Sequence, residues 1–74
     1  MNVQQQFGEN LAKIRREKGY SQEKLALETG IARSYLSGVE RGKRNISLIN
    51  ICIIAGKLEI PPSKLLDFSP ILET

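Results

Sequence analysis

The chain has 74 residues, enough for one small hydrophobic core and too few for a second domain. Eleven lysines and arginines against eight acidic residues give a net charge of +3, which suits an anionic partner without requiring one. With no histidine and one cysteine, Cys52, the chain lacks the residues for an internal disulfide, the usual metal-ligand sets and Cys/His or Ser/His catalysis. We expect no enzyme activity, no metal and no cofactor.

The first ten residues, MNVQQQFGEN, lack the apolar core of a signal peptide. No apolar stretch approaches the roughly 20 residues that would cross a bilayer. We therefore expect a cytoplasmic protein with no membrane contact.

The first predicted helix runs from about Val3 to Lys18. Phe7, Leu11 and Ile14 recur in it at spacings of four and three residues, and Gly19 follows as a stop signal. These three apolar residues are expected in the core.

Two short helices are predicted next, joined through Gly30. Ser21 suits the N-cap of a helix over residues 22–29, and a helix over residues 32–41 ends before Gly42. The positions expected to face the core are Leu25, Ala26 and Thr29 in the first of these helices and Ala32, Leu36 and Val39 in the second.

Ser47 is expected to cap a fourth helix that reaches Leu58, and Pro62 suits the first turn of a fifth that ends near Asp67. No strand-period alternation, repeat or linker interrupts this pattern. The expected fold class is all-α, with five helices in a single domain over residues 1–74.

Two short helices in a small basic domain are typical of a helix-turn-helix, here over about residues 21–41. In that motif the second helix lies in the major groove of DNA. The helical period places one set of residues opposite the core stripe of this helix: Arg33, Ser34, Ser37, Gly38 and Arg41. The same pattern also fits a solvated helix face, and periodicity alone does not separate the two interpretations.

Three motifs carry a family resemblance: SQEKLA, GIARSYLSGVERGKRN and IPPSKLL. Their order and spacing resemble those of the phage-repressor and Cro-like (XRE) helix-turn-helix regulators, and with LAKIRREKGY the resemblance covers roughly residues 7–66. Within this family, the run RSYLSGVERGKRNISLINI looks most like the controller proteins of bacterial restriction–modification systems. Stand-alone phage repressors and antitoxins share much of it. The resemblance implies a lambda-repressor-like DNA-binding domain that regulates transcription.

Arg33 is the main candidate for base recognition. Arginine can donate two hydrogen bonds to O6 and N7 of guanine, and the family has a DNA-reading residue near the start of the recognition helix. Ser34 and Ser37 are expected to support it. The alternative for Arg33 is a phosphate contact.

A second group of residues is expected to contact the DNA backbone. Gln22 lies in the first turn of its helix, where free amides and the helix dipole favour a phosphate, and the family uses this glutamine for a backbone contact. Tyr35 is expected to pack its ring while its hydroxyl reaches a phosphate; pure core packing is the alternative. The family also lays the following loop along the backbone, with Arg41, Lys43, Arg44 and Asn45. Solvated side chains are the alternative for Gln22 and for the loop.

Arg15 and Glu40 lie at the margins of the apolar stripes of their helices. The resemblance implies that they pair between the first and third helices. We assign the pair a structural role.

The fourth helix is apolar on two sides. Leu48, Ile51, Ile54, Ala55 and Leu58 form one stripe, whereas Ile49, Ile53 and Gly56 form a second, with Cys52 between the two. Such a helix is typically buried twice, in a core and against a partner. We expect a homodimer through residues 47–74, with Ile49, Cys52, Ile53 and Phe68 in the interface; packing under the C-terminal segment is the alternative.

The leading hypothesis is a homodimeric regulator that binds a palindromic double-stranded DNA operator and controls restriction–modification genes, including its own. RNA polymerase is a candidate second partner. The alternatives are a phage-type repressor, or an antitoxin or adaptor whose apolar face binds another protein.

Overall fold

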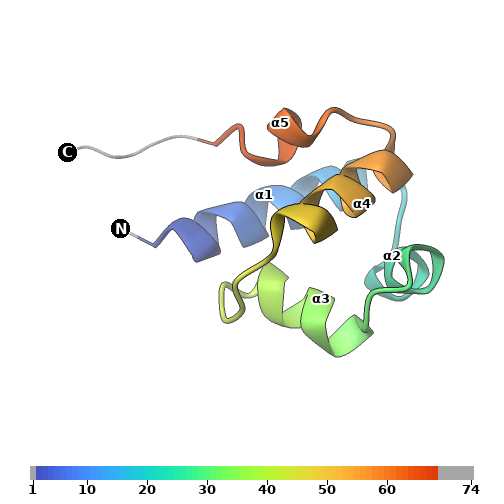
Figure 1. Ribbon diagram of the computed structural model, residues 1–74, viewed down its shortest axis with the longest axis horizontal. Helices are drawn as coiled ribbons and strands as arrows, with labels where there is room; N and C mark the ends of the chain where they lie inside the picture. The colour runs from blue at the N-terminus through green and yellow to red at the C-terminus, as the bar shows by residue number, and fades with distance from the viewer. Residues whose placement is uncertain (1, 69–74) are drawn as a thin grey trace.

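The computed structural model describes residues 2–68 (Figure 1). Its helices in chain order are α1 Val3–Glu17, α2 Gln22–Thr29, α3 Arg33–Glu40, α4 Leu48–Leu58 and α5 Pro62–Leu65. No strand occurs in this range. The expected all-α, five-helix fold is confirmed, and the helix ends differ from the predicted ones by at most two residues.

Local sequence signals start the helices. The side chain of Asn2 accepts a hydrogen bond from the Gln5 amide at 3.0 Å, and Ser21 accepts one from the Lys24 amide at 3.0 Å. Such caps satisfy amides that have no partner within the first turn. Between α2 and α3, Gly30 adopts a positive φ of 76°, which glycine tolerates because it has no β-carbon. This residue sets the sharp turn of the helix-turn-helix.

The core lies where the helices meet. Its largest fully buried side chains are Leu11, Leu25, Leu36, Val39, Ile54, Leu58 and Leu65. α3 packs against α1 and α2, while α4 packs against α2 and α5. Because every helix contributes to one core, α2 and α3 are held as a rigid pair on one side of the domain (Figure 1).

α1 and α3 approach very closely at Gly8. A β-carbon at this position would overlap the carbonyl oxygens of Val39 and Glu40 at the end of α3. Glycine therefore lets the two backbones touch, which fixes the C-terminal end of α3 and the start of the loop that follows it.

Three core expectations need correction. Ala32 is exposed because it is the N-cap of α3. Its ψ of 135° is extended, so the helical period does not predict the direction of its side chain. Leu48 is 77% exposed because it is the first residue of α4, and side chains at this position point beyond the helix start. Thr29 is only half-buried, and its hydroxyl donates to the Leu25 carbonyl at 2.7 Å.

Among the described residues, no helix combines the length and the apolar character that a bilayer crossing requires. Residues 69–74 of the predicted dimerisation region lie outside the part of the chain that the structure describes.

Candidate nucleic-acid interface

The three residues predicted to read bases lie in the first five positions of α3. Arg33 and Ser34 are exposed, and Ser37 is half-buried. Arg33 is the first helical residue, directly after the turn that joins α2 to α3. Its long side chain therefore starts from a fixed backbone position at the end of the helix that the motif points toward DNA.

Gly38 does not belong to the open face on which the sequence placed it. It is buried, and a β-carbon there would overlap Cγ of Arg44. The cover comes from the loop after the helix, which a helical projection of α3 alone does not include. The exposed face of α3 is therefore formed by its N-terminal half.

The loop that follows α3 exposes all four of its residues predicted to contact the DNA backbone: Arg41, Lys43, Arg44 and Asn45. It is anchored to α3 at several points. The amide of Lys43 donates to the Gly38 carbonyl at 2.8 Å, and the Tyr35 hydroxyl donates to the Asn45 carbonyl at 3.0 Å. The basic loop and the recognition helix thus form one continuous surface.

Tyr35 packs its ring as predicted, and the phosphate contact predicted for its hydroxyl stays a prediction. Its ring is half-buried against the core, as expected, but its hydroxyl donates its hydrogen within the protein, to Asn45. The guanidinium carbon of Arg44 lies 5.3 Å from the ring centroid, within cation–π range. Tyr35 therefore connects the helix to the loop.

Arg15 and Glu40 form the expected pair. Nε of Arg15 lies 2.7 Å from Oε2 of Glu40, and Nη2 lies 3.0 Å from Oε1, a two-point contact between α1 and α3. The two side chains are only 10% and 6% exposed. A buried charge pair is tolerated where further hydrogen bonds satisfy it, and here Nη1 of Arg15 donates to the Tyr20 carbonyl at 2.8 Å.

Gln22 also joins this network. Its amide nitrogen donates to Oε1 of Glu40 at 2.9 Å, which links the start of α2 to the end of α3. This contact could not be predicted from the sequence, because the two residues are 18 positions apart and share no periodic pattern. The network fixes the relative position of the two helices of the motif.

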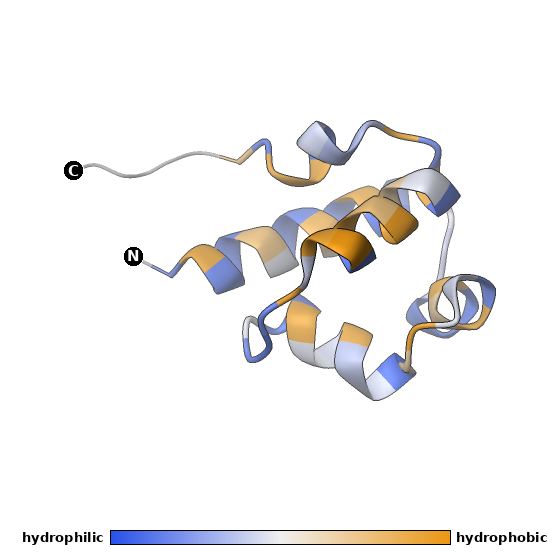
Figure 2. Cartoon of the chain, in the orientation of Figure 1, coloured by the Kyte–Doolittle hydropathy of each residue, from blue (hydrophilic) through white to orange (hydrophobic). Residues whose placement is uncertain are grey.

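The second apolar stripe of α4 is open to solvent. Leu48, Ile49, Cys52 and Ile53 line a shallow groove of about 400 Å³, with Ile49 73% and Ile53 41% exposed. Hydropathy colouring shows strongly apolar residues over the first turns of this helix (Figure 2). Exposed apolar residues grouped in this way indicate an interaction surface.

Phe68 does not line this groove. It is half-buried, packs against the core and lines a separate hollow on α1 with Gln6, Glu9, Asn10 and Lys13. Phe68 thus lies beside α1, away from the open stripe of α4. Of the four residues predicted in the dimer interface, Ile49, Cys52 and Ile53 therefore share the α4 groove, and Phe68 lies elsewhere.

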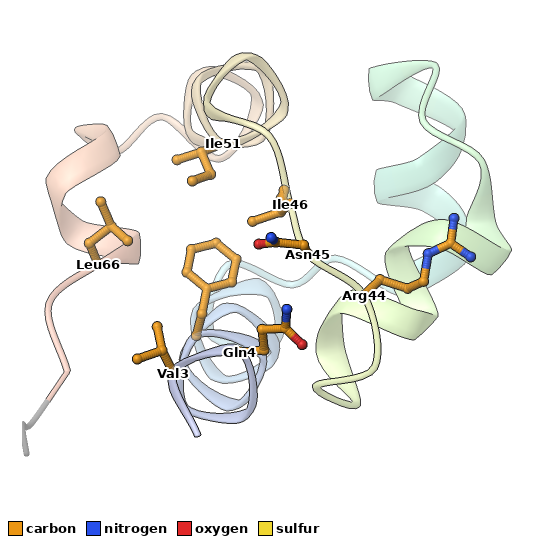
Figure 3. Close-up of a pocket in the computed structure, with 8 residues that line it drawn as sticks. Val3, Gln4, Arg44, Asn45, Ile46, Ile51 and Leu66 are labelled. Atoms are coloured by element: carbon orange, nitrogen blue, oxygen red, sulfur yellow. The ribbon is translucent and has the colours of Figure 1, made fainter. Parts of the chain in front are cut away.

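A small cavity of about 140 Å³ lies behind the basic loop, between the start of α1, α4 and the end of α5 (Figure 3). Val3, Ile46, Ile51 and Leu66 give it an apolar lining, and Arg44 extends away from it across α3. Ile46 anchors the far end of the loop to the core.

A family model described as helix-turn-helix matches residues 11–65. The chain belongs to this XRE-like helix-turn-helix family. It is 46% identical over 71 residues to the control protein C.BamHI of Bacillus amyloliquefaciens, an alignment that covers 95% of this chain and 88% of that protein.

Solved structures agree. The restriction–modification controller protein C.AhdI from Aeromonas hydrophila superposes with a TM-score of 0.81 and 50% identity, covering 84% of this chain and 94% of that one. The C.Esp1396I controller, solved as a tetramer with its natural 35 base-pair operator, superposes with a TM-score of 0.79 and 31% identity, covering 90% and 88% of the two chains. The chain is a helix-turn-helix transcription regulator of the restriction–modification controller type.

Proposed function

We propose that this chain binds a palindromic operator as a homodimer and thereby controls transcription of restriction–modification genes, including its own. The observation that carries the proposal is the joint surface of α3 and the basic loop. Arg33 and Ser34 project from the start of the recognition helix, and the exposed Lys43 and Arg44 lie on a loop fastened to the same helix.

Each residue of the surface then has a distinct role. Arg33 reads a guanine with support from Ser34 and Ser37, whereas Arg41, Lys43, Arg44 and Asn45 contact phosphates. Gln22 contributes a phosphate contact from the first turn of α2. An amide nitrogen carries two hydrogens, so the bond to Glu40 still leaves one for a phosphate.

The second copy is expected on the α4 groove. A two-fold axis places the same apolar residues, Ile49, Cys52 and Ile53, on both sides of the interface and presents two recognition helices to two half-sites. The regulator works in the cytoplasm, where the operator is, and contact of the bound dimer with RNA polymerase completes the proposal.

The α4 groove also favours a second candidate, an antitoxin or adaptor that binds an unlike protein. Selection of duplexes from a random-sequence pool by the purified chain, followed by titration at two salt concentrations, separates the candidates. We expect an enriched, palindromic operator duplex whose affinity falls steeply with salt, because phosphate contacts release counterions. A chain that enriches no duplex would support the adaptor. Flanking methyltransferase and endonuclease genes would support the controller assignment.

Lys43→Ala and Arg44→Ala are expected to lower affinity for every DNA sequence. Each change removes one phosphate contact per subunit, so the slope of log affinity against log salt should flatten by about one unit or less per subunit. Titrations of the operator duplex and of a scrambled duplex at several salt concentrations measure this slope. Lys13→Ala, which removes an exposed charge from α1, is the matched control and should leave the slope unchanged. An unchanged slope in the loop variants would place these side chains in solvent.

A further inference from the structure

We infer that Tyr35 and Gly38 are positioning residues that seat Arg44 on the recognition helix, so that the phosphate-contacting loop and the base-reading helix bind DNA as one rigid unit. The inference rests on the proposed function and extends it. It assigns to these two residues of α3 a role in setting where Arg44 meets the DNA, in place of a direct contact of their own.

The seat begins with the missing side chain of Gly38. A β-carbon at this position would overlap Cγ of Arg44 and lie 3.5 Å from its Cβ and Cδ. The aliphatic part of Arg44 therefore lies directly on the backbone of α3. Figure 3 shows this side chain leaving the loop and crossing the helix. Any larger residue at position 38 would force Arg44 off the helix.

Tyr35 holds the other end of the same side chain. It lies about one helical turn before Gly38, and the Arg44 guanidinium carbon is 5.3 Å from its ring centroid. Its hydroxyl donates to the carbonyl of Asn45 at 3.0 Å, the residue that follows Arg44. Tyr35 therefore contacts both the charged group of Arg44 and the backbone beside it.

The backbone of the loop is fixed to the same two positions. The Lys43 amide donates to the Gly38 carbonyl at 2.8 Å, so three consecutive residues, 43–45, are each held by Tyr35 or Gly38. The turn before them is equally restricted. A β-carbon on Gly42, which has a φ of 74°, would come within 2.8 Å of Cα of Gln5 on α1. The loop can therefore move little without moving α3.

Preorganisation of this kind affects both affinity and register. A side chain that is already held in place loses less conformational entropy when it binds. Arg44 is held at a fixed position relative to Arg33. It can therefore contact a phosphate only when Arg33 is also placed at the base that it reads. By holding Arg44 in place, Tyr35 and Gly38 make its phosphate contact depend on correct docking of α3, although a phosphate itself carries no sequence information.

A double-mutant cycle on the selected operator duplex tests the inference. Gly38→Ala should lower affinity about tenfold when Arg44 is present, the loss expected for one charge-assisted hydrogen bond. In the Arg44→Ala background the same change should have little effect, because Cγ and Cδ, the atoms it would displace, are gone. Additive losses, or no loss from Gly38→Ala alone, would overturn the inference. Circular dichroism verifies that each variant keeps its helices.

Tyr35→Phe is the second variant. It keeps the ring and removes only the hydroxyl, which donates a hydrogen bond to the Asn45 carbonyl. It should lower operator affinity severalfold, and by less in the Arg44→Ala background. Equal losses with and without Arg44 would overturn the link between Tyr35 and the seat.

A measurement without DNA separates this inference from the proposed function. In the free protein, proton NMR should show side-chain protons of Arg44 shifted by the Tyr35 ring, and the shift should disappear in Gly38→Ala. A wild-type Arg44 with the averaged shifts of a free side chain would overturn the seat even if the protein binds its operator. A shifted Arg44 in a chain that enriches no duplex would instead refute the proposed function.

Discussion

Arg33→Ala is expected to remove most of the sequence specificity while leaving non-specific DNA binding nearly intact. Arg33 is exposed at the first position of α3, so we expect its truncation to leave the core packing unchanged. A bidentate arginine–guanine contact is worth about 1–3 kcal/mol of discrimination, and a dimer makes it twice. The dimer should therefore lose about 2–6 kcal/mol on its operator, at least about thirtyfold in affinity.

Titrations of wild type and Arg33→Ala against the operator and a scrambled duplex decide this prediction. The phosphate-contacting loop is untouched, so the slope against salt on scrambled DNA should stay as in wild type. Lys13→Ala serves as the control for loss of an exposed positive charge on α1, where Lys13 lines the hollow beside Phe68. Equal losses on both duplexes would instead assign Arg33 to the phosphate contacts.

The helices were predictable because their signals are local. Ser21 and Ser47 cap α2 and α4, accepting hydrogen bonds from the amides of Lys24 and Asn50 as their sequence positions suggested. The helical period likewise identified the buried stripes of α1 and α4, apart from Leu48. That residue is the first of α4, so its side chain points beyond the start of the helix, an end effect that the helical period does not show.

The parts of the site that the sequence did not predict depend on contacts between separate segments. Gly38 is covered by a loop residue, and the helical period of α3 contains no information on where that loop lies. Gln22 meets Glu40 only after three helices have packed together. Phe68 was grouped with α4 because both are apolar, yet the path of the chain after α5 takes it to α1. Side-chain chemistry was therefore easier to predict than side-chain surroundings.

Ile53→Asp is expected to produce a folded monomer. Ile53 is 41% exposed and lies one turn after Ile49 in the open groove of α4, whereas the core side of this helix, Ile51, Ile54, Ala55 and Leu58, is untouched. In the proposed dimer the change introduces two carboxylates into an apolar interface. The desolvation of unpaired buried charges costs several kcal/mol each, enough to dissociate a small dimer.

Loss of the dimer should have a large effect on operator binding. A monomer presents one recognition helix to one half-site and loses the effective concentration that a linked second site provides, a factor of about a hundred or more. Affinity for the palindromic duplex should fall by that factor, while weak binding to scrambled DNA should change little. Sedimentation and circular dichroism measure assembly and folding, with Leu27→Asp, at an 80% exposed leucine on α2, as the control for adding the same charge outside the groove. A variant that remains dimeric would move the interface away from α4, and one that unfolds would show that Ile53 is needed for the core of the monomer.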